Sequence, residues 1–493
     1  LPVVLCLESL GSHRLPCFCA PSMASDAGGS QLEQQCVLLF SDNQRLKRFR
    51  PTTWKVQGRG RAFSRGNTFD GEGLTDMTCC LDSDTLLAFT EDGLVFTIQV
   101  SGIPLAKKMN GSSTELSDLV PEWDAGKRIV AFFAIPHQKS LADVTDKFAL
   151  LVSERGMAKK VSLDKLRGLR TGKAVQCMSL EPWDKLRCAH LISEGQGQIL
   201  VCATTQGYVL RFAIDKNFRS ASLTGPCVSA VRLRVTDRLA SVAVQDVTPE
   251  ELAVSSMAAQ ELNGDGVFDD GSDQEGAAAE DEAVEASAKK ASKTRCILII
   301  TAAGMGKRVS LSYARMRLSN RGMHGRRAIR LAPQDRVVSV SVVTGETKEL
   351  MPARSAFSIF HAEHQNDEMK ENDITAAYAN GNETEGDASR IKRNALIFSR
   401  LPEEERKVYR DRAHGRRLEA AEYYKRVEGL LIGSVDGRVS RLAVPSVPVM
   451  STACMGKSII KGAVSAVCRF SPGGPLPDTA EPPQKRRKTL ALL

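Results

Sequence analysis

The chain has 493 residues and a net charge of +9, and its charge is unevenly placed. Residues 261–288 hold ten Asp or Glu and no Lys or Arg, so the rest of the chain carries +19. An excess of positive charge of this size favours a polyanionic partner such as nucleic acid or an acidic membrane. Lys and Arg that only keep the protein in solution would give the same net charge. No apolar stretch approaches the ~20 residues of a membrane-spanning helix. Thirteen Cys without a pair of CxxC motifs argue against a disulfide framework, and we expect reduced, buried thiols.

The chain begins at Leu1 with a Ser-, Pro- and Cys-containing stretch, 1–35, that holds few acids. We expect this stretch to be disordered, and two origins stay open. It is either the end of a targeting peptide or a translated upstream region, with Met23 as the true start.

One phrase then recurs along the chain. It stands as Gly-Met-Gly-Lys-Arg-Val-Ser-Leu at 304–311 and as Gly-Met-Ala-Lys-Lys-Val-Ser-Leu at 156–163. Looser copies start at Gly93, Gly207 and Gly437, and a degenerate copy starts at Gln44. An apolar run precedes most copies, which is the pattern of a β-hairpin.

A second landmark, an Asp before a β-branched run, follows five of the six phrases. We place it at Asp76, Asp124, Asp184, Asp237 and Asp335, and we interpret it as a turn residue rather than a catalytic group. The spacing defines a unit of about fifty residues, present six times. One such four-stranded sheet buries too little surface to be stable alone, so the pattern predicts six blades packed radially in a closed, propeller-like ring.

The expected organisation divides the chain into seven parts. Blades 1 to 4 occupy 36–247, blade 5 occupies 295–343 and blade 6 occupies 428–470. The acidic, Ala- and Gly-rich insertion 248–294 lacks large apolar residues, and we expect disorder there. The insertion 344–427 is predicted to be disordered and then helical, from Leu401 to Arg426. The tail 471–493 is predicted to be disordered and carries a basic cluster, Lys485 to Lys488, that resembles a nuclear import signal.

At this point the residues resemble a known family. A strand, a Gly, a Lys-Arg pair, an Arg-x-x-Gly loop and an Asp-Val-Val run resemble the blades of the C-terminal domain of the DNA gyrase A and topoisomerase IV A polypeptides. Leu86 to Phe96 with Ile103-Pro104 is similar to the second blade of that family, and Leu166 to Val175 to the third. The resemblance implies an all-β, six-bladed β-pinwheel whose basic rim binds and bends duplex DNA with little sequence specificity.

Two sets of basic residues are the candidate DNA contacts, because phosphate contacts give affinity without reading sequence. One set lies in the repeated phrase and the other in the loop that follows it. The candidates are Lys47, Arg48, Gln57, Arg59, Arg61, Lys159, Lys160, Arg167, Arg170, Lys173, Lys307, Arg308, Arg321, Arg326 and Arg327.

The chain departs from the family pattern in the gyrase-A box, Gln-Arg-Arg-Gly-Gly-Lys-Gly. Here the corresponding stretch is Gln57-Gly-Arg-Gly-Arg-Ala-Phe63, which keeps Gln57, Arg59 and Gly60. In the family this box allows full chiral wrapping of DNA. Its degeneration leaves DNA binding expected and strong wrapping open, and a plain Gly-rich surface loop is the alternative interpretation.

The chain also departs from the family pattern in lacking the motif of the catalytic half. No Tyr here stands in the Arg-Tyr-Thr context of the strand-cutting residue, so we expect no catalysis by this chain alone. We expect no cofactor and no metal, because His361 and His364 form only a pair without a third ligand. The expected partners are duplex DNA and the catalytic part of a type II topoisomerase.

Two other functions stay open at this stage. The ring could be a protein-interaction scaffold, or the chain could be a fragment of a full DNA gyrase A polypeptide. The resemblance favours a plastid or another organelle with bacterial-type DNA, whereas Lys485 to Lys488 favour the nucleus.

Overall fold

The structure is a computed structural model. It describes residues 35–345, with gaps at 70, 121–122, 125, 136–146, 167–168, 170–172, 194–196, 215–217, 248–294, 312–315 and 317, together with 355–364, 387–424 and 427–470. The predicted insertion 248–294 and tail 471–493, almost all of the predicted segment 1–35, and residues 346–354, 365–386 and 425–426 of the insertion 344–427 lie outside the described residues. In the described part no helix is long and apolar enough to cross a membrane.

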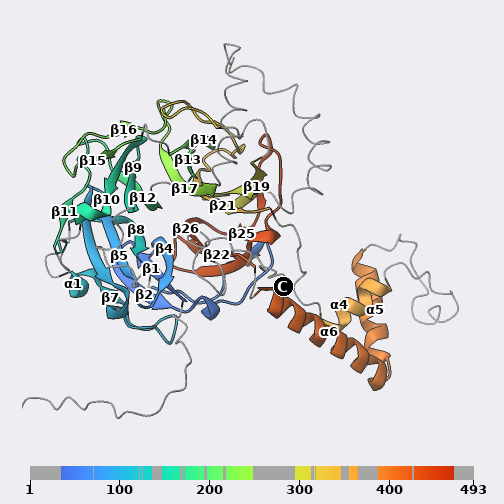
Figure 1. The fold of residues 1–493 in the computed structure, drawn as a ribbon. Coiled ribbons are helices and arrows are strands. Elements are labelled where there is room, and N and C mark those ends of the chain that lie inside the picture. The colour runs from blue at the N-terminus through green and yellow to red at the C-terminus, as the bar shows by residue number, and fades with distance from the viewer. Residues whose placement is uncertain are drawn as a thin grey trace, which may run out of the picture.

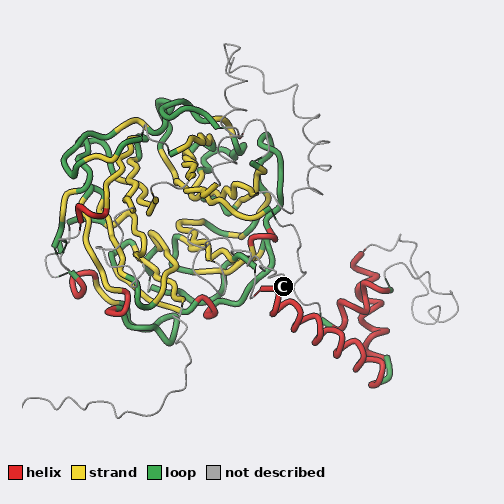
Figure 2. The backbone as a smooth tube through the Cα atoms, in the orientation of Figure 1, coloured by secondary structure: helices red, strands yellow, loops and turns green. Residues whose placement is uncertain are grey.

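Six small, mainly antiparallel sheets stand side by side in a ring, as predicted, and the strands of each sheet follow one another from the centre of the ring to its edge (Figures 1 and 2). Blades 1 to 3 have the strand orders β4-β1-β2-β7, β8-β5-β6-β11 and β12-β9-β10-β15. Blades 4 to 6 have the orders β17-β13-β14-β20, β21-β18-β19-β24 and β26-β22-β23.

The strand bounds of the first three sequence units are β1 (Gln35–Ser41), β2 (Arg45–Phe49), β3 (Arg61–Ala62), β4 (Leu74–Leu81), β5 (Thr85–Thr90), β6 (Leu94–Gln99), β7 (Thr114–Glu115), β8 (Ile129–Ile135), β9 (Lys147–Ser153), β10 (Met157–Ser162), β11 (Val175–Gln176) and β12 (Leu186–Ser193). Those of the last three are β13 (Gly197–Thr204), β14 (Tyr208–Ala213), β15 (Ser220–Ala221), β16 (Val228–Ser229), β17 (Leu239–Val247), β18 (Arg295–Thr301), β19 (Met305–Ser310), β20 (Arg326–Arg327), β21 (Val337–Thr344), β22 (Gly429–Ser434), β23 (Val439–Ala443), β24 (Lys457–Ser458), β25 (Ile460–Lys461) and β26 (Val464–Phe470). Short helical turns, α1 (Leu116–Leu119), η1 (Pro51–Thr53), η2 (Val100–Gly102), η3 (Leu163–Leu166) and η6 (Val444–Ser446), lie in the connections near the edge.

Each blade takes its outermost strand from the next unit of the sequence. The short strand β7 of unit two pairs with β2, β11 pairs with β6, β20 pairs with β14, and β24 pairs with β19. Unit one completes the last blade, because Val56 and Asn67 bridge to Arg441 and Arg438 beside β23, and β3 pairs with β25. The ring is therefore closed by the first unit lying over the sixth.

The hydrophobic core lies between the blades. Each of the six main clusters of buried residues joins two neighbouring sheets, and the cluster around Val37, Leu431 and Phe470 joins the first to the last. At this seam Cys79 Sγ and Cys468 Sγ lie 3.3 Å apart. The thiols are free, as predicted, among the described cysteines. Because the apolar faces are buried only against neighbours, stability belongs to the ring and not to a blade.

The repeated Gly explains how neighbouring units fit together. In five hairpins it has a positive φ, and its carbonyl accepts a hydrogen bond from the next unit, for example Ile459 N to Gly304 O at 3.0 Å. A Cβ on Gly304 would lie 2.3 Å from Ile460 O. The Gly thus supplies the turn conformation and the space for the crossing chain. Blade 1 has Gln44 at this place, at φ 60°, and Gln44 Oε1 accepts from Ile129 N instead.

A buried hydroxyl closes every hairpin. The last residue of the first strand accepts a hydrogen bond from the backbone N–H four residues later, at 2.9 to 3.3 Å, in all six blades. These residues are Ser41, Thr90, Ser153, Thr204, Thr301 and Ser434. The pattern Ser/Thr-x-x-Gly is therefore part of the structural signature of the repeat.

The Asp landmark is a turn cap in three units. The carboxylates of Asp184, Asp237 and Asp335 accept from backbone N–H groups of the hairpin turn of their own blade, at 3.0 to 3.1 Å. The interpretation as a turn residue is wrong for Asp76, and it holds for Asp124 at a different turn. Asp76 lies inside β4, opposite Phe40, and the residue directly before that strand start is Gly73. Asp124 lies five residues before β8 and caps its own local turn, at Gly126 N.

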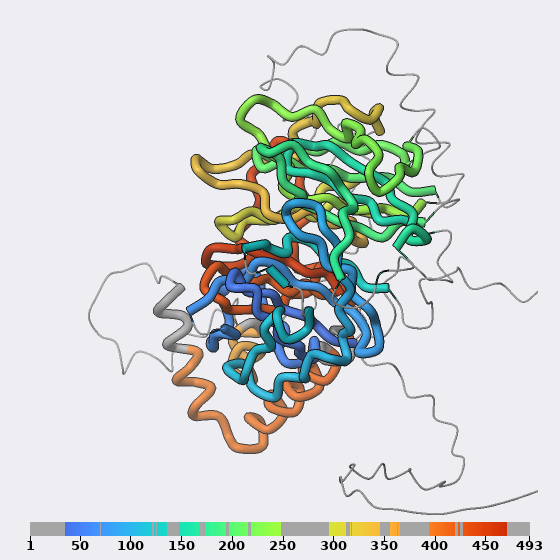
Figure 3. Tube along the Cα trace, turned by 90° about the vertical axis from the view of Figure 1, so that its left-hand side faces the viewer, coloured from blue at the N-terminus to red at the C-terminus, as the bar shows by residue number. Residues whose placement is uncertain are grey.

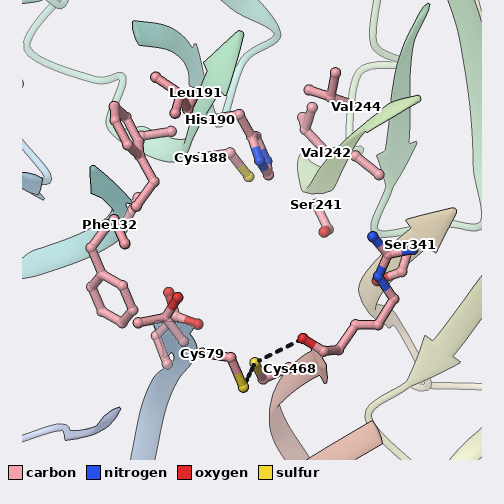
Figure 4. Close-up of a pocket in the computed structure, with 18 of the residues that line it drawn as sticks. Cys79, Phe132, Cys188, His190, Leu191, Ser241, Val242, Val244, Ser341 and Cys468 are labelled. Atoms are coloured by element: carbon pink, nitrogen blue, oxygen red, sulfur yellow. Dashed lines mark hydrogen bonds between the residues drawn. The ribbon is translucent and has the colours of Figure 1, made fainter. Parts of the chain in front are cut away.

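The innermost strands surround a central channel with a cavity of about 440 Å³ (Figure 4). Its wall includes Asp76, Cys79, Arg187 and His190. Burial lowers the pKa of His190 to about 4, so its ring is neutral. Burial raises the pKa of Asp76 to about 6, although the Met77 N–H and Arg187 stabilise the carboxylate.

The two faces of the ring differ. The six hairpin turns lie on one face, where the innermost strands begin. The connections between blades lie on the other face, because each innermost strand ends there and the next unit starts there. The strand ends that flank both long insertions lie on this connection face.

The described residues of the insertion 344–427 include the helices α4 (Ala356–Glu363), α5 (Asp387–Arg400) and α6 (Glu403–Tyr424), and α4 and α5 lie in the part that was predicted to be disordered. They lie outside the ring, and α6 falls within the stretch predicted to be helical (Figures 1 and 3). Phe360, Phe398 and Tyr409 pack together, with ring centroids 5.3 to 6.0 Å apart. The insertion therefore has a small core of its own.

We predict that Gly304→Ala strongly destabilises the ring. The substitution adds a Cβ at φ +77° and forces it against Ile460 O, so we expect a loss of about 2–4 kcal/mol in the free energy of unfolding. Chemical denaturation of the whole chain measures it. The matched control is Gly71→Ala, at φ +75° with open space around it, which costs only about 1 kcal/mol. Equal losses in the two variants would show that the crossing chain does not restrict this position.

We also predict a pH-dependent effect of Asp76→Asn. The folded pKa, about 6, lies above the ordinary value of 3.8, so the stability contribution of Asp76 is present at pH 4 and is lost as the pH rises through 6. Asn removes this loss, and we expect it to stabilise the fold by about 1–2 kcal/mol at pH 7.5 and not at pH 4. Denaturation at both pH values, with the exposed Asp42→Asn as control, measures the difference. A gain of equal size at both pH values would contradict the assignment.

Candidate nucleic-acid interface

The Lys of the repeated phrase is buried and holds the next unit of the chain. Lys307 is fully buried, and its Nζ donates to the carbonyls of Ser451 and Cys454 at 2.5 and 2.7 Å. Burial lowers its pKa to about 8. In the same way Lys159 Nζ donates to Leu223 O at 2.6 Å, and Lys47 Nζ donates to Met109 O of unit two at 3.3 Å as well as to Thr68 O of its own unit.

The next residue of the phrase acts similarly. Arg308 is 1 % exposed and donates through Nε to Val447 O at 2.7 Å and through Nη1 to Thr344 O at 3.0 Å. Arg48 donates to Val100 O at 3.1 Å. Lys160, also buried, lies 4.1 Å from the centre of the Phe148 ring.

The phrase cations therefore differ from expectation in their placement. We expected Lys47, Arg48, Lys159, Lys160, Lys307 and Arg308 on the rim, and the structure places them under the outer segment contributed by the next unit. The physical reason is the exchange of outer strands, which covers the second strand of each blade. Buried cations are stable there because backbone carbonyls or an aromatic face them. Arg211 and Arg441, which the sequence reasoning missed, stand at the place of Arg308 and donate to Met316 O and Pro51 O.

The basic loop of unit one lies on the edge of the ring. Arg59 and Arg61 are exposed, and Gln57 is partly buried, with its side-chain amide 3.4 Å from Ala62 O. Phe63, at the end of the degenerate box, is buried in the core between blades 5 and 6. This loop is also the ring closure, since Gln57 N donates to Arg441 O and Gly60 N to Ile459 O.

The basic loop of unit five lies along the outer edge of blade 4. Arg321 and Arg327 are exposed, and Arg326 is partly buried beside them. Arg327 donates to the Tyr208 hydroxyl at 3.0 Å, and the Arg234 guanidinium stacks 3.7 Å over the same ring. Arg321 donates to Ser229 O at 2.9 Å. These contacts thus fix the guanidinium groups on the exposed edge. In unit three Lys173 is exposed, whereas Arg167 and Arg170 lie outside the described residues.

The outer segments are not equally basic. Residues 311–334, 445–462 and 51–69 contain Lys and Arg but no Asp or Glu. They cover the outer edges of blades 4, 5 and 6, which are neighbours, so they form one continuous surface that we call the acid-free arc. Units two and three place Glu115, Asp118, Asp164 and Glu181 among their edge cations. The described cations exposed on the arc are Lys55, Arg59, Arg61, Arg65, Arg321, Arg327, Arg330, Lys457 and Lys461.

We predict that Lys307→Met destabilises the ring by about 2–4 kcal/mol. The change preserves most of the side-chain volume but leaves three buried carbonyls without their donor. Lys461→Met on the exposed edge is the matched control, and we expect it to change the free energy of unfolding by less than about 0.5 kcal/mol. A Lys307→Met protein as stable as the control would overturn the structural role of this ammonium group.

Comparison with known proteins agrees with the β-propeller fold of the ring. A family model described as the DNA gyrase C-terminal domain, β-propeller, matches residues 84–111, 147–187, 198–216 and 297–344. The chain is 25% identical to the chloroplastic/mitochondrial DNA gyrase A polypeptide of Arabidopsis thaliana over 331 residues, which cover 65% of this chain and 31% of that protein. It is 24% identical to the DNA gyrase A polypeptide of Synechocystis over 327 residues, which cover 64% of this chain and 34% of that protein. The chain thus spans about a third of the length of these relatives.

A solved structure of a DNA gyrase A C-terminal domain has the same fold. It superposes with a TM-score of 0.52 at 13% identity and covers 89% of this chain and all of that one. The matched segments lie in the hairpins and inner strands of blades 2 to 5. The hairpins and inner strands of blades 2 to 5 thus resemble the DNA gyrase A C-terminal β-propeller domain in sequence, and the ring has the fold of that domain.

Proposed function

We propose that this ring binds duplex DNA around its outer edge and bends it, with little sequence specificity. The observation that carries the proposal is the acid-free arc, on which three neighbouring outer segments present cations without a single carboxylate. A curved surface of this kind suits a phosphate backbone, because such contacts follow the duplex without reading its bases.

Only some of the residues predicted to contact DNA lie on the acid-free arc. The proposal rests on Arg59, Arg61, Arg321 and Arg327, with Arg326 partly accessible, and it places Lys173 on a weaker part of the edge. The buried phrase cations act indirectly, since they hold the outer segments in place. Bending a duplex by tens of degrees costs a few kcal/mol, which several charged contacts offset.

The DNA topology role rests on the relatives. Because this chain spans about a third of their length, we propose that it acts beside the catalytic part of a type II topoisomerase, through which it would affect DNA topology. Plant relatives bear the names chloroplastic/mitochondrial, and on that basis we propose an organelle, the plastid first, as its compartment. None of these comparisons supports the nuclear alternative.

We predict that Arg61→Gln/Arg65→Gln weakens duplex binding several-fold to tenfold at 100 mM salt. Each lost phosphate contact removes about 0.9 from the slope of log K against log salt, so the slope should fall by nearly 2. Fluorescence anisotropy of a labelled duplex across a salt series measures both quantities. The control double variant, Lys107→Gln/Lys108→Gln, removes the same charge from exposed positions outside the arc. Equal losses in the two doubles would refute the arc, and binding without salt dependence would refute the DNA proposal.

Chiral wrapping is a separate question with its own measurement. A relaxed plasmid is religated by a type I topoisomerase in the presence of the whole chain. The segment that corresponds to the gyrase-A box is paired with the sixth unit through β3 and β25, and it keeps only part of the family pattern. We therefore predict little change in the linking number of the plasmid at saturating protein. A large change of one sign would show that wrapping does not need the full box.

A further inference from the structure

The channel opens on the hairpin face into a basic mouth with a cavity of about 520 Å³. Arg128, Arg187, Arg238 and Arg336 line it, and they come from blades 2, 3, 4 and 5 in order. Two acids, Asp42 and Glu154, also line it. The rim contacts proposed for DNA lie elsewhere, on the outer edge, so this site is independent of that proposal.

The fold brings these arginines together by repeating one backbone position. The carbonyls of Arg128, Arg238 and Arg336 each accept an N–H from the hairpin turn of their own blade, at 2.8 to 2.9 Å. Each side chain therefore starts from the same place around the opening. In blade 3 the equivalent residue, Lys185, is paired with Glu91 at 2.8 Å, and Arg187, at an irregularity near the start of β12, lines the mouth instead.

Arg187 forms the floor of the mouth, because it lines both this cavity and the channel below it. Its Nε donates to Ala240 O at 3.0 Å, which fixes the guanidinium. Its Nη groups have no hydrogen-bond partner among the residues that the structure describes, although Asp76 in the channel attracts the charge. Arg128 and Arg336 are exposed and form no ion pair within the described part of the chain.

The chemistry of the mouth fits closely spaced phosphates. Guanidinium groups form paired hydrogen bonds to phosphate oxygens, and four of them outnumber the two acids. A cavity of this size holds a small molecule and not a macromolecule. The strand ends from which the long insertions start lie on the opposite face, so the insertions do not start beside this opening.

We propose that the basic mouth binds a small polyphosphate anion, with one phosphate on Arg187 and the others on Arg128, Arg238 and Arg336. A nucleoside triphosphate and inorganic polyphosphate share this chemistry. The mouth would thus bind a soluble anion, whereas the other cations of the ring either stabilise the structure or lie on its edge.

Isothermal titration calorimetry of the full chain with tripolyphosphate, and separately with ATP, tests the proposal. We expect one site, and we expect Arg128→Gln/Arg336→Gln to weaken tripolyphosphate binding at least tenfold. Arg187→Met, which retains the apolar stem, should weaken it as much. Thermal denaturation identifies any variant that fails to fold. If Arg187→Met unfolds, the Arg128→Gln/Arg336→Gln variant, whose changes are at exposed positions, still measures the contribution of the mouth to binding. Lys107→Gln/Lys108→Gln, with the same charge change on the edge, should leave binding unchanged.

The two ligands separate the two sources. Tighter binding of ATP than of tripolyphosphate would assign part of the affinity to the base and sugar, and equal binding would assign it to phosphate alone; both support the site. Absence of binding, or equal weakening by the mouth and edge double variants, would overturn it. Duplex DNA that displaces tripolyphosphate from the wild type and from the Arg61/Arg65 variant alike would also overturn it, because the mouth would then be a DNA contact.

Discussion

The whole ring depends on one backbone contact, in which the carbonyl of a hairpin turn accepts an N–H from the next unit of the chain. Five of these carbonyls belong to glycines, and a Cβ there would lie within 2.1 to 2.7 Å of a carbonyl oxygen of the crossing segment. The contact sets the distance between neighbours and so defines the space in which the apolar residues of two sheets meet. A change that moves the crossing segment by an ångström would disturb both the hydrogen bond and the core behind it.

The positive charge of the chain is divided between three uses. Lysines and arginines of the phrase are buried against carbonyls, and they tie each blade to its neighbour. Cations of the outer segments lie on the edge, and those of the innermost strand starts surround the mouth. Net charge alone could not separate these uses, because a buried ammonium group and an exposed one count equally in a sequence.

The six-bladed ring was predictable from the sequence because the repeat is periodic and no unit can bury its apolar faces alone. The exchange of outer strands was not predictable, since strands of two residues such as β7 and β20 carry no hydrophobic pattern. That exchange determines which cations are covered, so Lys307 and Arg308 were assigned to the surface on the strength of a motif that serves packing. Asp76 was misassigned because an Asp before a run of strand-forming residues can also lie inside the strand. The Ser/Thr-x-x-Gly signal was present in nearly every unit, and a column-by-column alignment of the six hairpins would have found it.

The unit that repeats in the sequence is out of phase with the blade seen in space. Each sequence unit builds three strands of one sheet and the outer strand of the sheet before it, around the full circle. A gene duplication that copies one sequence unit would therefore insert a donor and an acceptor of an outer strand together. Such a ring could gain or lose a blade without exposing an unpaired edge strand. The number of blades is therefore set by the angle between neighbouring blades and not by the pairing of strands.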